Sequence, residues 1–432
     1  MAMGGAIGTG LFLGSGLAVG TAGPGVVLSY AIAAAMALLL GRALTEMAVH
    51  RPTAGSFGVY AGDYVSAFAG YAVRVSYWLM QVIATGGHMV AVSIYMQFWF
   101  PAVPAALWIV GFSAALVYLN TRDVGSFGTF EYWFAMIKVA AIVLFVILGT
   151  ALALGLTGEP AVGTRHLLGH GGFLPKGWSG VWLAVCFVIY SFIGVEIVAI
   201  TSGEAKDPER TIPRAMRRMI GALCALYLVT VTLLVTLMPW SQAGVGESPF
   251  VTVLTSVGVP AAASVMNFVV LSAALSGANA NLYLITRTLF SLARAGFAPP
   301  QLGRLDHNGI PRAALLASSL GLGAAVLVQT VWPDSAYVWF FGVALFGGLF
   351  VWFMIFVTHL RFPVVPAYGD NIRHRVTSVV GALLVVAVFV STWWIPGLRA
   401  TILAGAPWLL LLAVGYALTK RSQASSTPRQ SS

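Results

Sequence analysis

The chain has 432 residues, of which 59% are hydrophobic and only 8% are charged, and its mean hydropathy is +0.89. This composition excludes an ordinary soluble protein and indicates one that crosses a membrane many times. The net charge of +10 does not indicate a nucleic-acid partner, because the basic residues lie in alternate loops between apolar runs.

The apolar runs are continuous rather than alternating, which predicts membrane-spanning helices and not a barrel of strands. Because one crossing takes roughly 20 residues as a helix, the chain has room for about a dozen. We expect an all-α polytopic protein of the lipid bilayer with twelve transmembrane helices, at approximately residues 3–22, 25–47, 70–98, 102–119, 128–155, 179–203, 217–238, 260–292, 312–331, 335–359, 376–394 and 400–419.

The lysines and arginines predict the orientation of these helices. With the N-terminus inside, nearly all of them lie in inner loops or at inner helix ends, and only Arg165, Lys176 and Arg399 fall outside. We therefore expect both termini in the cytoplasm. The first span begins only a few residues after Met1, without the positively charged region of a signal peptide, so we also expect a cytoplasmic segment that precedes Met1.

Glycines interrupt two of the expected spans. The first span contains Gly4-Gly5-Ala6-Ile7-Gly8-Thr9-Gly10, and the sixth contains Phe192-Ile193-Gly194-Val195-Glu196. Close packing through small residues is one explanation of the first run. Paired interruptions at matching positions of two five-helix repeats instead indicate a transporter site near the bilayer midplane, because unwound backbone at that depth persists only around a buried site or a cavity.

Two facing interruptions have the chemistry to bind a zwitterion. Unwinding leaves amide groups at one half-helix end and carbonyl groups at the other, which suit an anion and a cation respectively. An α-amino acid would place its carboxylate on the Gly8-Thr9-Gly10 amides and its ammonium on carbonyls near Phe192 and Ile193. Thr9 would add a hydroxyl, and Phe192 would close over the substrate side chain.

Charged side chains inside the spans are the next candidates. Lys138 lies within an apolar run, where a cation is costly, and it is either a proton-coupling residue or a side chain that extends to the inner surface. Glu196 directly follows the second interruption, and it is either a proton-linked gate or a neutral acid that holds the loose backbone. Glu46 and Arg42, four residues apart on one helix face, predict an ion pair.

Three polar residues are weaker candidates for the wall of the site. His88 is the only histidine well inside an expected span, and it is either a titrating group or a core histidine with satisfied hydrogen bonds. Gln81 and Asn279 are candidates for the same wall. His166 and His170 lie in a glycine-rich outer loop and do not predict a zinc site. We expect no cofactor and no metal.

The sequence resembles the bacterial amino acid transporter branch of the amino acid–polyamine–organocation superfamily. The similarity covers essentially the whole chain, and the segment that begins at Ser191 is highly specific. The matching segments are GGAIGTGLFLGSG at 4–16, PTAGSFGVYAGDYV at 52–65, YWFAMIKVAAI at 132–142, SFIGVEIVAITSGEAKDPERTIPRAM at 191–216 and ANANLYLITRTLFSLARAGFAP at 278–299.

The resemblance implies a particular architecture. Of the twelve helices, the first ten would form a five-plus-five inverted repeat (LeuT-like) with broken helices 1 and 6 and alternating access. The first repeat would span residues 1–155 and the second 156–359, followed by two extra helices in 360–419 and a cytoplasmic tail at 420–432.

The resemblance also implies roles for individual residues. The first interruption would receive the substrate carboxylate through Ile7, Gly8, Thr9 and Gly10. The second would surround the ammonium and side chain through Ser191, Phe192, Ile193 and Gly194. Lys138 would take the position of a sodium ion in a proton-coupled importer, and Glu196 matches the functional glutamate of the family.

We therefore expect a secondary active permease of the bacterial cytoplasmic (inner) membrane that imports an α-amino acid with a proton. An amino acid exchanger with the same site is an alternative, and a non-transporting amino acid sensor is a more distant one. An enzyme is not expected, because no nucleophile elbow, metal cluster or phosphate loop is present in the sequence.

Overall fold

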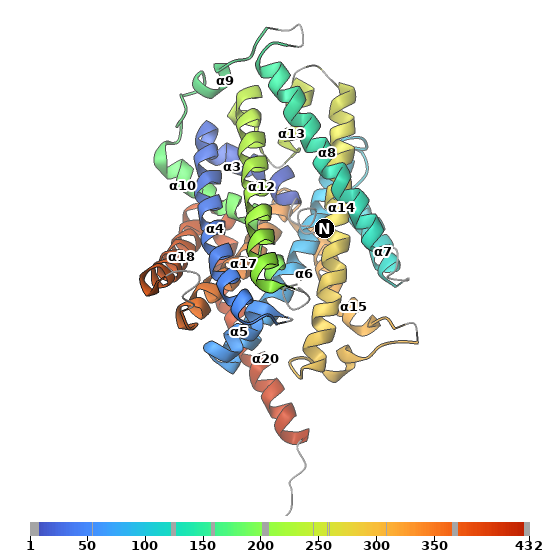
Figure 1. Ribbon diagram of the computed structural model, residues 1–432. Coiled ribbons are helices and arrows are strands. Elements are labelled where there is room, and N and C mark those ends of the chain that lie inside the picture. Colours follow the sequence, from blue (N-terminus) through green and yellow to red (C-terminus); the bar gives the residue numbers. More distant parts are fainter. Residues whose placement is uncertain are drawn as a thin grey trace, which may run out of the picture.

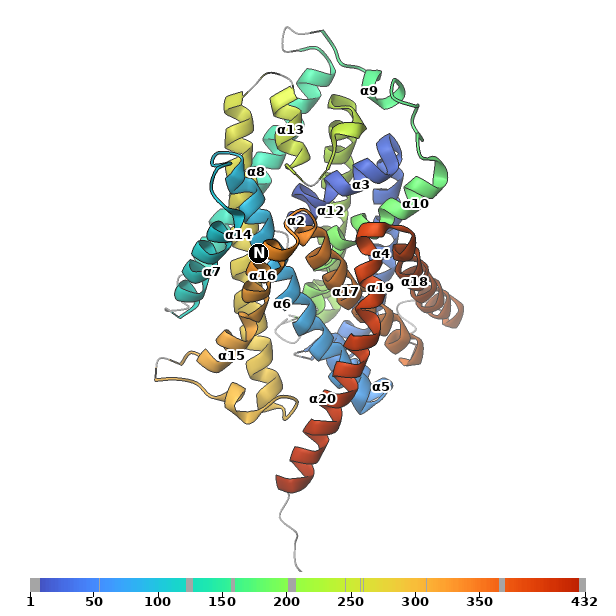
Figure 2. The same ribbon diagram turned by 180° about the vertical axis from the view of Figure 1, so that it is seen from behind.

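The computed structural model describes residues 8–53, 55–121, 127–156, 160–200, 207–244, 246–256, 258, 260–307, 309–364 and 370–426. Within these ranges the regular structure consists of α-helices and short 3-10 turns, without strands (Figures 1 and 2). Ten stretches of the described chain are long and apolar enough to cross a membrane. The prediction of an all-α, multi-pass membrane protein is confirmed.

The helices follow one another along the chain from α2 to α20. They are α2 (Thr9–Phe12), α3 (Gly14–Ala22), α4 (Val26–His50), α5 (Ser56–Tyr64), α6 (Ala67–Gln97), α7 (Ala105–Asn120), α8 (Phe127–Ala153), α9 (Arg165–Leu168), α10 (Gly177–Val188), α11 (Ile197–Ile200), α12 (Pro208–Leu237), α13 (Pro249–Ser256), α14 (Pro260–Arg294), α15 (Arg312–Ser318), α16 (Leu320–Val331), α17 (Ala336–Arg361), α18 (Asn371–Ser391), α19 (Arg399–Leu403) and α20 (Gly405–Ser426). The 3-10 turns include η1 (Gly23–Gly25), η3 (Ile189–Phe192) and η5 (Trp240–Gln242).

Helices lie in every range predicted for a span, but the number of crossings stays a prediction. The stretch Gly14–His50 is one of the ten candidates although η1 interrupts it, and α7 is a shorter apolar helix. The start of α12 differs most from its prediction. It begins at Pro208, because Asp207 accepts the first helical hydrogen bond from Thr211 through its carbonyl, so charged turns precede the apolar part.

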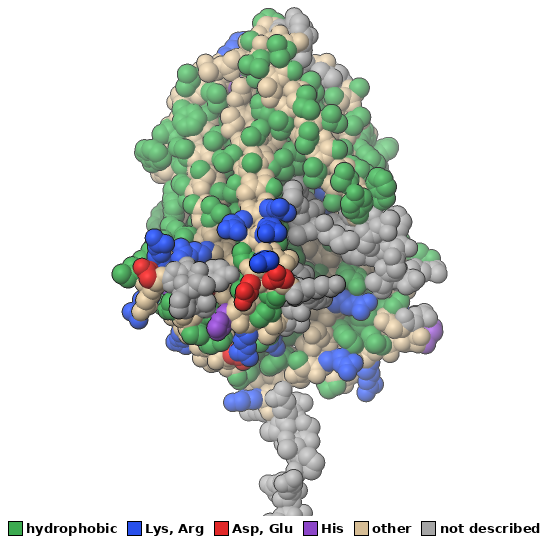
Figure 3. Space-filling view, in the orientation of Figure 1, with side chains coloured by type: hydrophobic (Ala, Val, Ile, Leu, Met, Phe, Trp, Pro, Cys, Tyr) green, Lys and Arg blue, Asp and Glu red, His purple; other side chains and the backbone are tan. Residues whose placement is uncertain are grey.

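The surface shows where a bilayer would surround the protein. In Figure 3 apolar side chains cover the broad part of the visible face, whereas Lys and Arg side chains gather toward the end where α5 and α20 lie. We call this the α20 end of the molecule and the opposite one the α9 end. An apolar band of this kind is expected for a protein whose helices face lipid.

The two spans in which glycines predicted an interruption, the first and the sixth, are both interrupted helices. The first is divided at Leu13 between α2 and α3, and Gly8 is the residue that precedes α2. The sixth runs from α10 through η3, opens between Phe192 and Ile197, and resumes as α11. Gly194 has a φ of +115° in this opening, a conformation that side chains with a Cβ rarely adopt.

The central helix α6 packs against α14, α16 and α17. At its crossing with α16 two glycines permit unusually close approach. A Cβ added to Gly321 would collide with the carbonyl oxygen of Val82, and one added to Gly86 would lie 2.5 Å from that of Gly321. Since both obstacles are backbone atoms, neither can move away without displacing a helix.

The variant Gly321→Ala should therefore destabilise the protein. We expect a loss of about 1–3 kcal/mol or more, because overpacking forces the backbones apart. A thermal unfolding curve of the detergent-solubilised protein measures the loss. Gly323→Ala is the matched control, because it lies on the same helix and nothing is within 4 Å of the added Cβ. Equal melting temperatures for the two variants would contradict the close crossing.

Candidate functional site

The two interruptions lie directly against each other. A Cβ added to Gly10 would lie 3.2 Å from both Cα and Oγ of Ser191 and 3.3 Å from a ring carbon of Tyr190. Gly10 belongs to α2 and the other two residues to η3, so segments far apart in the sequence meet at this contact. The absence of a side chain at Gly10 is what permits this approach.

The first interruption presents backbone groups in a buried position. Thr9 and Gly10 are buried, and they occupy the first turn of α2, where N–H groups have no acceptor within the helix. The carbonyl of Thr9 is already used, since it accepts a hydrogen bond of 3.1 Å from the Tyr337 hydroxyl. Ile7 was predicted as part of this site and lies outside the described residues.

The second interruption is held by its own glutamate. The N–H of Gly194 donates to both carboxylate oxygens of Glu196, at 3.0 Å each. Glu196 has only 1% of its surface exposed, and Phe192 is equally buried. Ile193 packs on α17, where a Cβ added to Gly348 would collide with its side chain. The Glu196 side chain therefore stabilises the open backbone, a contact that is compatible with both interpretations of this residue.

Aromatic residues that sequence reasoning did not single out surround this contact. The Tyr227 hydroxyl donates to the carbonyl of Ser191 at 3.1 Å, and its ring meets Phe192 edge-on with centroids 5.3 Å apart. Tyr190 packs against Phe341, with ring centroids 4.4 Å apart. With 12% aromatic residues in the chain, no local signal distinguished these rings from ordinary core residues.

Ser191 and Tyr30 place two buried hydroxyls beside the contact between the interruptions. The two side chains interact with each other, and neither hydroxyl makes a further hydrogen bond of normal geometry among the described residues. The Ser191 hydroxyl faces the Gly10 backbone across the contact between the interruptions. A hydroxyl has both a donor and acceptor lone pairs, so Ser191 can bind a polar group of a ligand at this position.

His88 lies at the first interruption, and Lys138 is close enough to His88 for its charge to act on it. The Lys138 side chain is fully buried, so it does not extend to the surface. Its charge acts on His88, whose Nδ1 donates to the carbonyl of Ala84 at 2.7 Å. The other ring nitrogen of His88, Nε2, lies 3.5 Å from a Cβ added to Gly8 and 2.8 Å from one added to Gly277. The structure thus brings His88 to the first interruption.

The other two wall candidates make contacts with neighbouring helices. Asn281 donates to the Gln81 side chain at 3.4 Å, and Asn120 donates to Asn279 at 2.9 Å. These bonds link α14 to α6 and to α7. They form a polar layer beside the site, and Gln81 and Asn279 already have protein partners in it.

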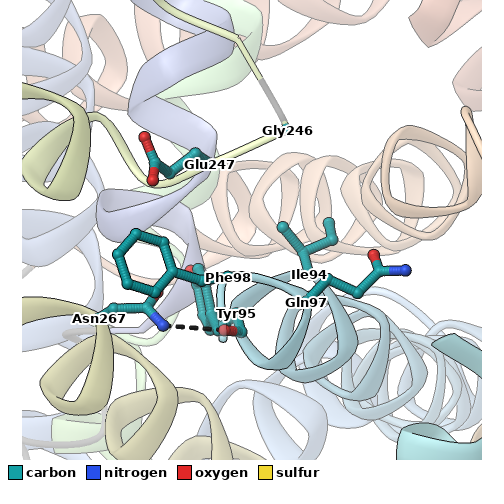
Figure 4. A pocket seen from close by; sticks show the side chains of 7 residues that line it. All are labelled: Ile94, Tyr95, Gln97, Phe98, Gly246, Glu247 and Asn267. Carbon is teal, nitrogen blue, oxygen red and sulfur yellow. Dashed lines mark hydrogen bonds between the residues drawn. The ribbon is translucent and has the colours of Figure 1, made fainter. Parts of the chain in front are cut away.

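A surface pocket lies apart from the interruptions, toward the α9 end (Figure 4). Asn267 donates to the carbonyl of Tyr95 within it, at 2.8 Å. It contains none of the predicted site residues; its lining is Ile94, Tyr95, Gln97, Phe98, Gly246, Glu247 and Asn267.

The segment before α13 covers the first span at the α9 end. The Ser248 hydroxyl donates to the carbonyl of Phe12 at 2.6 Å, and the backbone of Gly244 leaves no space for a side chain at Gly16. The interruptions are therefore covered by protein toward the α9 end.

Comparisons with known proteins identify the family of the chain. The model of the amino acid permease family matches residues 1–425. The chain is 34% identical to the uncharacterized amino acid permease YtnA of Bacillus subtilis (strain 168), over 99% of this chain and 95% of that protein. It is 36% identical to the aromatic amino acid transport protein AroP of Escherichia coli (strain K12), over 98% of this chain and 94% of the relative. AroP of Salmonella typhimurium LT2 is also 36% identical, over 96% and 92%.

The fold and these similarities define a multi-pass transporter of the cell membrane and not an enzyme. More particularly, the chain belongs to the amino acid permease family, as the resemblance indicated.

Proposed function

We propose that this protein imports an α-amino acid across the cytoplasmic membrane by proton symport with alternating access. The observation that carries the proposal is the contact of the two interruptions at Gly10 and Ser191. Backbone donors from one broken helix and carbonyls from another offer both kinds of group that a zwitterion needs.

The substrate carboxylate binds the amides of Gly8, Thr9 and Gly10 in this proposal. The ammonium binds carbonyls of the second interruption and the hydroxyl of Ser191. The Tyr190 ring lies against Gly10 and the Phe341 ring against Gly14. These two packed rings provide a surface for an apolar side chain of the substrate. Together with the name of the AroP relatives, these rings favour an aromatic amino acid as the substrate.

Proton coupling is assigned to Lys138 and Glu196. Lys138 is fully buried within a span, and its charge acts on His88 beside the first interruption. Ionisable residues inside membrane spans commonly belong to proton pathways. Protonation of Lys138 would place a positive charge where a sodium ion would otherwise bind, and loss of that proton would follow the conformational change.

The architecture we propose is the five-plus-five inverted repeat, with helices 1–5 in residues 1–155 and helices 6–10 in 156–359. Two further helices in 360–419 complete twelve spans, and the tail follows from residue 420. The basic residues toward the α20 end in Figure 3 favour a cytoplasmic location for this end and for both termini.

Uptake into proteoliposomes tests the proposal. We expect radiolabelled aromatic amino acids to accumulate when an inward proton gradient is imposed, and not when a sodium gradient replaces it. Other amino acids, presented as a panel under the same conditions, identify the substrate class. Exchange with internal amino acid that proceeds equally well without any ion gradient would instead establish an exchanger, and binding without any flux would establish a sensor.

A further inference from the structure

A second polar cluster lies far along the spans from the two interruptions. Glu46 near the end of α4, His359 near the end of α17 and His374 near the start of α18 converge with ligand atoms within 4.8 Å of one another. All three side chains are buried, with 0–3% of each side chain exposed. Sequence reasoning paired Glu46 with Arg42 and did not include either histidine.

Each oxygen of the Glu46 carboxylate faces a different imidazole. The distance from Oε2 to Nε2 of His359 is 3.1 Å, and from Oε1 to Nδ1 of His374 it is 2.9 Å. The planes of the two rings are tilted by 32°, with centroids 4.0 Å apart. One carboxylate and two ring nitrogens, contributed by three helices, therefore lie within 4.8 Å of one another.

The hydrogen bonds of Ser378 show what this region needs. The Ser378 hydroxyl donates its single proton to the carbonyl of His374 at 3.0 Å, so it accepts from Nδ1 of His359 at 2.7 Å. A neutral His359 then has a lone pair on Nε2, directed at a carboxylate oxygen. Two acceptors cannot face each other at this distance without a cation between them, which is either a proton or a metal ion.

The donor set favours the metal ion. Two imidazoles and one carboxylate are a common protein ligand set for zinc, with a fourth position left for water. A histidine ligand normally donates its other ring N–H to a fixed oxygen, and Ser378 is that oxygen for His359. The ligand atom of His374 would be Nδ1, the ring nitrogen that faces Glu46 at 2.9 Å.

We propose that Glu46, His359 and His374 bind a divalent transition metal ion of the zinc class and thereby join α4, α17 and α18. The site lies about one turn from the last residue of α4, His50, and within a few residues of the end of α17 and the start of α18. Arg42 lies close enough for its positive charge to act on His359, so it would also repel the bound ion.

Cobalt binding to the purified, chelator-treated full chain tests this site. Co²⁺ substitutes for Zn²⁺ and reports tetrahedral binding through its visible absorption. The background variant is His166→Asn/His170→Asn, because these loop histidines, with ring centroids 5.5 Å apart, are a separate pair that could bind the ion. We expect one Co²⁺ per chain, displaced by Zn²⁺, and a rise in melting temperature when either ion is added.

Variants locate the ion. Glu46→Gln and His374→Gln should abolish the cobalt spectrum, and Ser378→Ala should weaken binding about tenfold to a hundredfold, because it releases the His359 ring. His50→Gln, on the exposed end of α4, should change nothing.

A conservative variant separates metal binding from a purely structural role. His374→Cys keeps a metal ligand and should retain cobalt, with an added absorption from the thiolate. Monodisperse protein that binds no cobalt, or cobalt binding that Glu46→Gln leaves intact, would overturn the proposal and leave a proton between these groups.

Discussion

Gly10→Val should reduce amino acid uptake about a hundredfold, because a displacement near 1 Å in a binding site has an effect of this order. Even one added carbon at Gly10 would lie 3.2 Å from the backbone of Ser191, and valine brings two more. The two interruptions would have to separate, and the groups that bind the carboxylate and the ammonium would no longer match one substrate.

Initial uptake rates in proteoliposomes, at equal amounts of reconstituted protein, measure this effect. Gly221→Val is the matched control, since it is the same change on α12 at a position where nothing lies within 4 Å of the added Cβ. If Gly10→Val transports at the rate of the control, the contact between the interruptions is not part of the transport site.

Lys138→Met should abolish concentrative uptake and leave the exchange of labelled for unlabelled substrate. One proton that moves through 100 mV supplies about 2.3 kcal/mol, enough to accumulate an amino acid roughly 50-fold. Without the buried cation the proton is no longer coupled, so the inside concentration should only equal the outside one. Methionine fills a similar volume, which limits the loss of packing at this fully buried position.

The steady-state ratio of internal to external substrate, with and without a proton gradient, measures the coupling. Lys176→Met removes a lysine at a position over the Trp240 ring, away from the interruptions, and should accumulate substrate normally. A Lys138→Met protein that still concentrates substrate would show that Lys138 is structural and that another group carries the proton.

The agreement between prediction and structure is best for local features. The interruption at Phe192 to Glu196 was predicted from a glycine beside a glutamate in an apolar run, and the helix does open there. Lys138 was identified because a cation is conspicuous in such a run, and it is fully buried. The start of α12 at Pro208 lies ahead of the span expected from residue 217, because hydropathy does not register the charged turns that Asp207 and Pro208 initiate.

Contacts between distant segments could not be predicted in the same way. The predicted pairing of Glu46 with Arg42 used the face of a single helix, whereas the contacts of its carboxylate with His359 and His374 come from two other helices. Tyr337, which donates to the carbonyl of Thr9, has no feature in the sequence that separates it from the other aromatic residues.

The sequence by itself determined that the chain is a polytopic helical membrane protein. It also determined where two of the helices are interrupted and that Lys138 lies within a span. These properties follow from apolarity, glycine and charge, which act on a short segment whatever lies around it. Only the tertiary structure decided that Gly10 meets Ser191, that tyrosines surround this contact and that two histidines converge on Glu46. Such contacts depend on how each helix is rotated and placed against its neighbours, which the packing of the whole bundle determines.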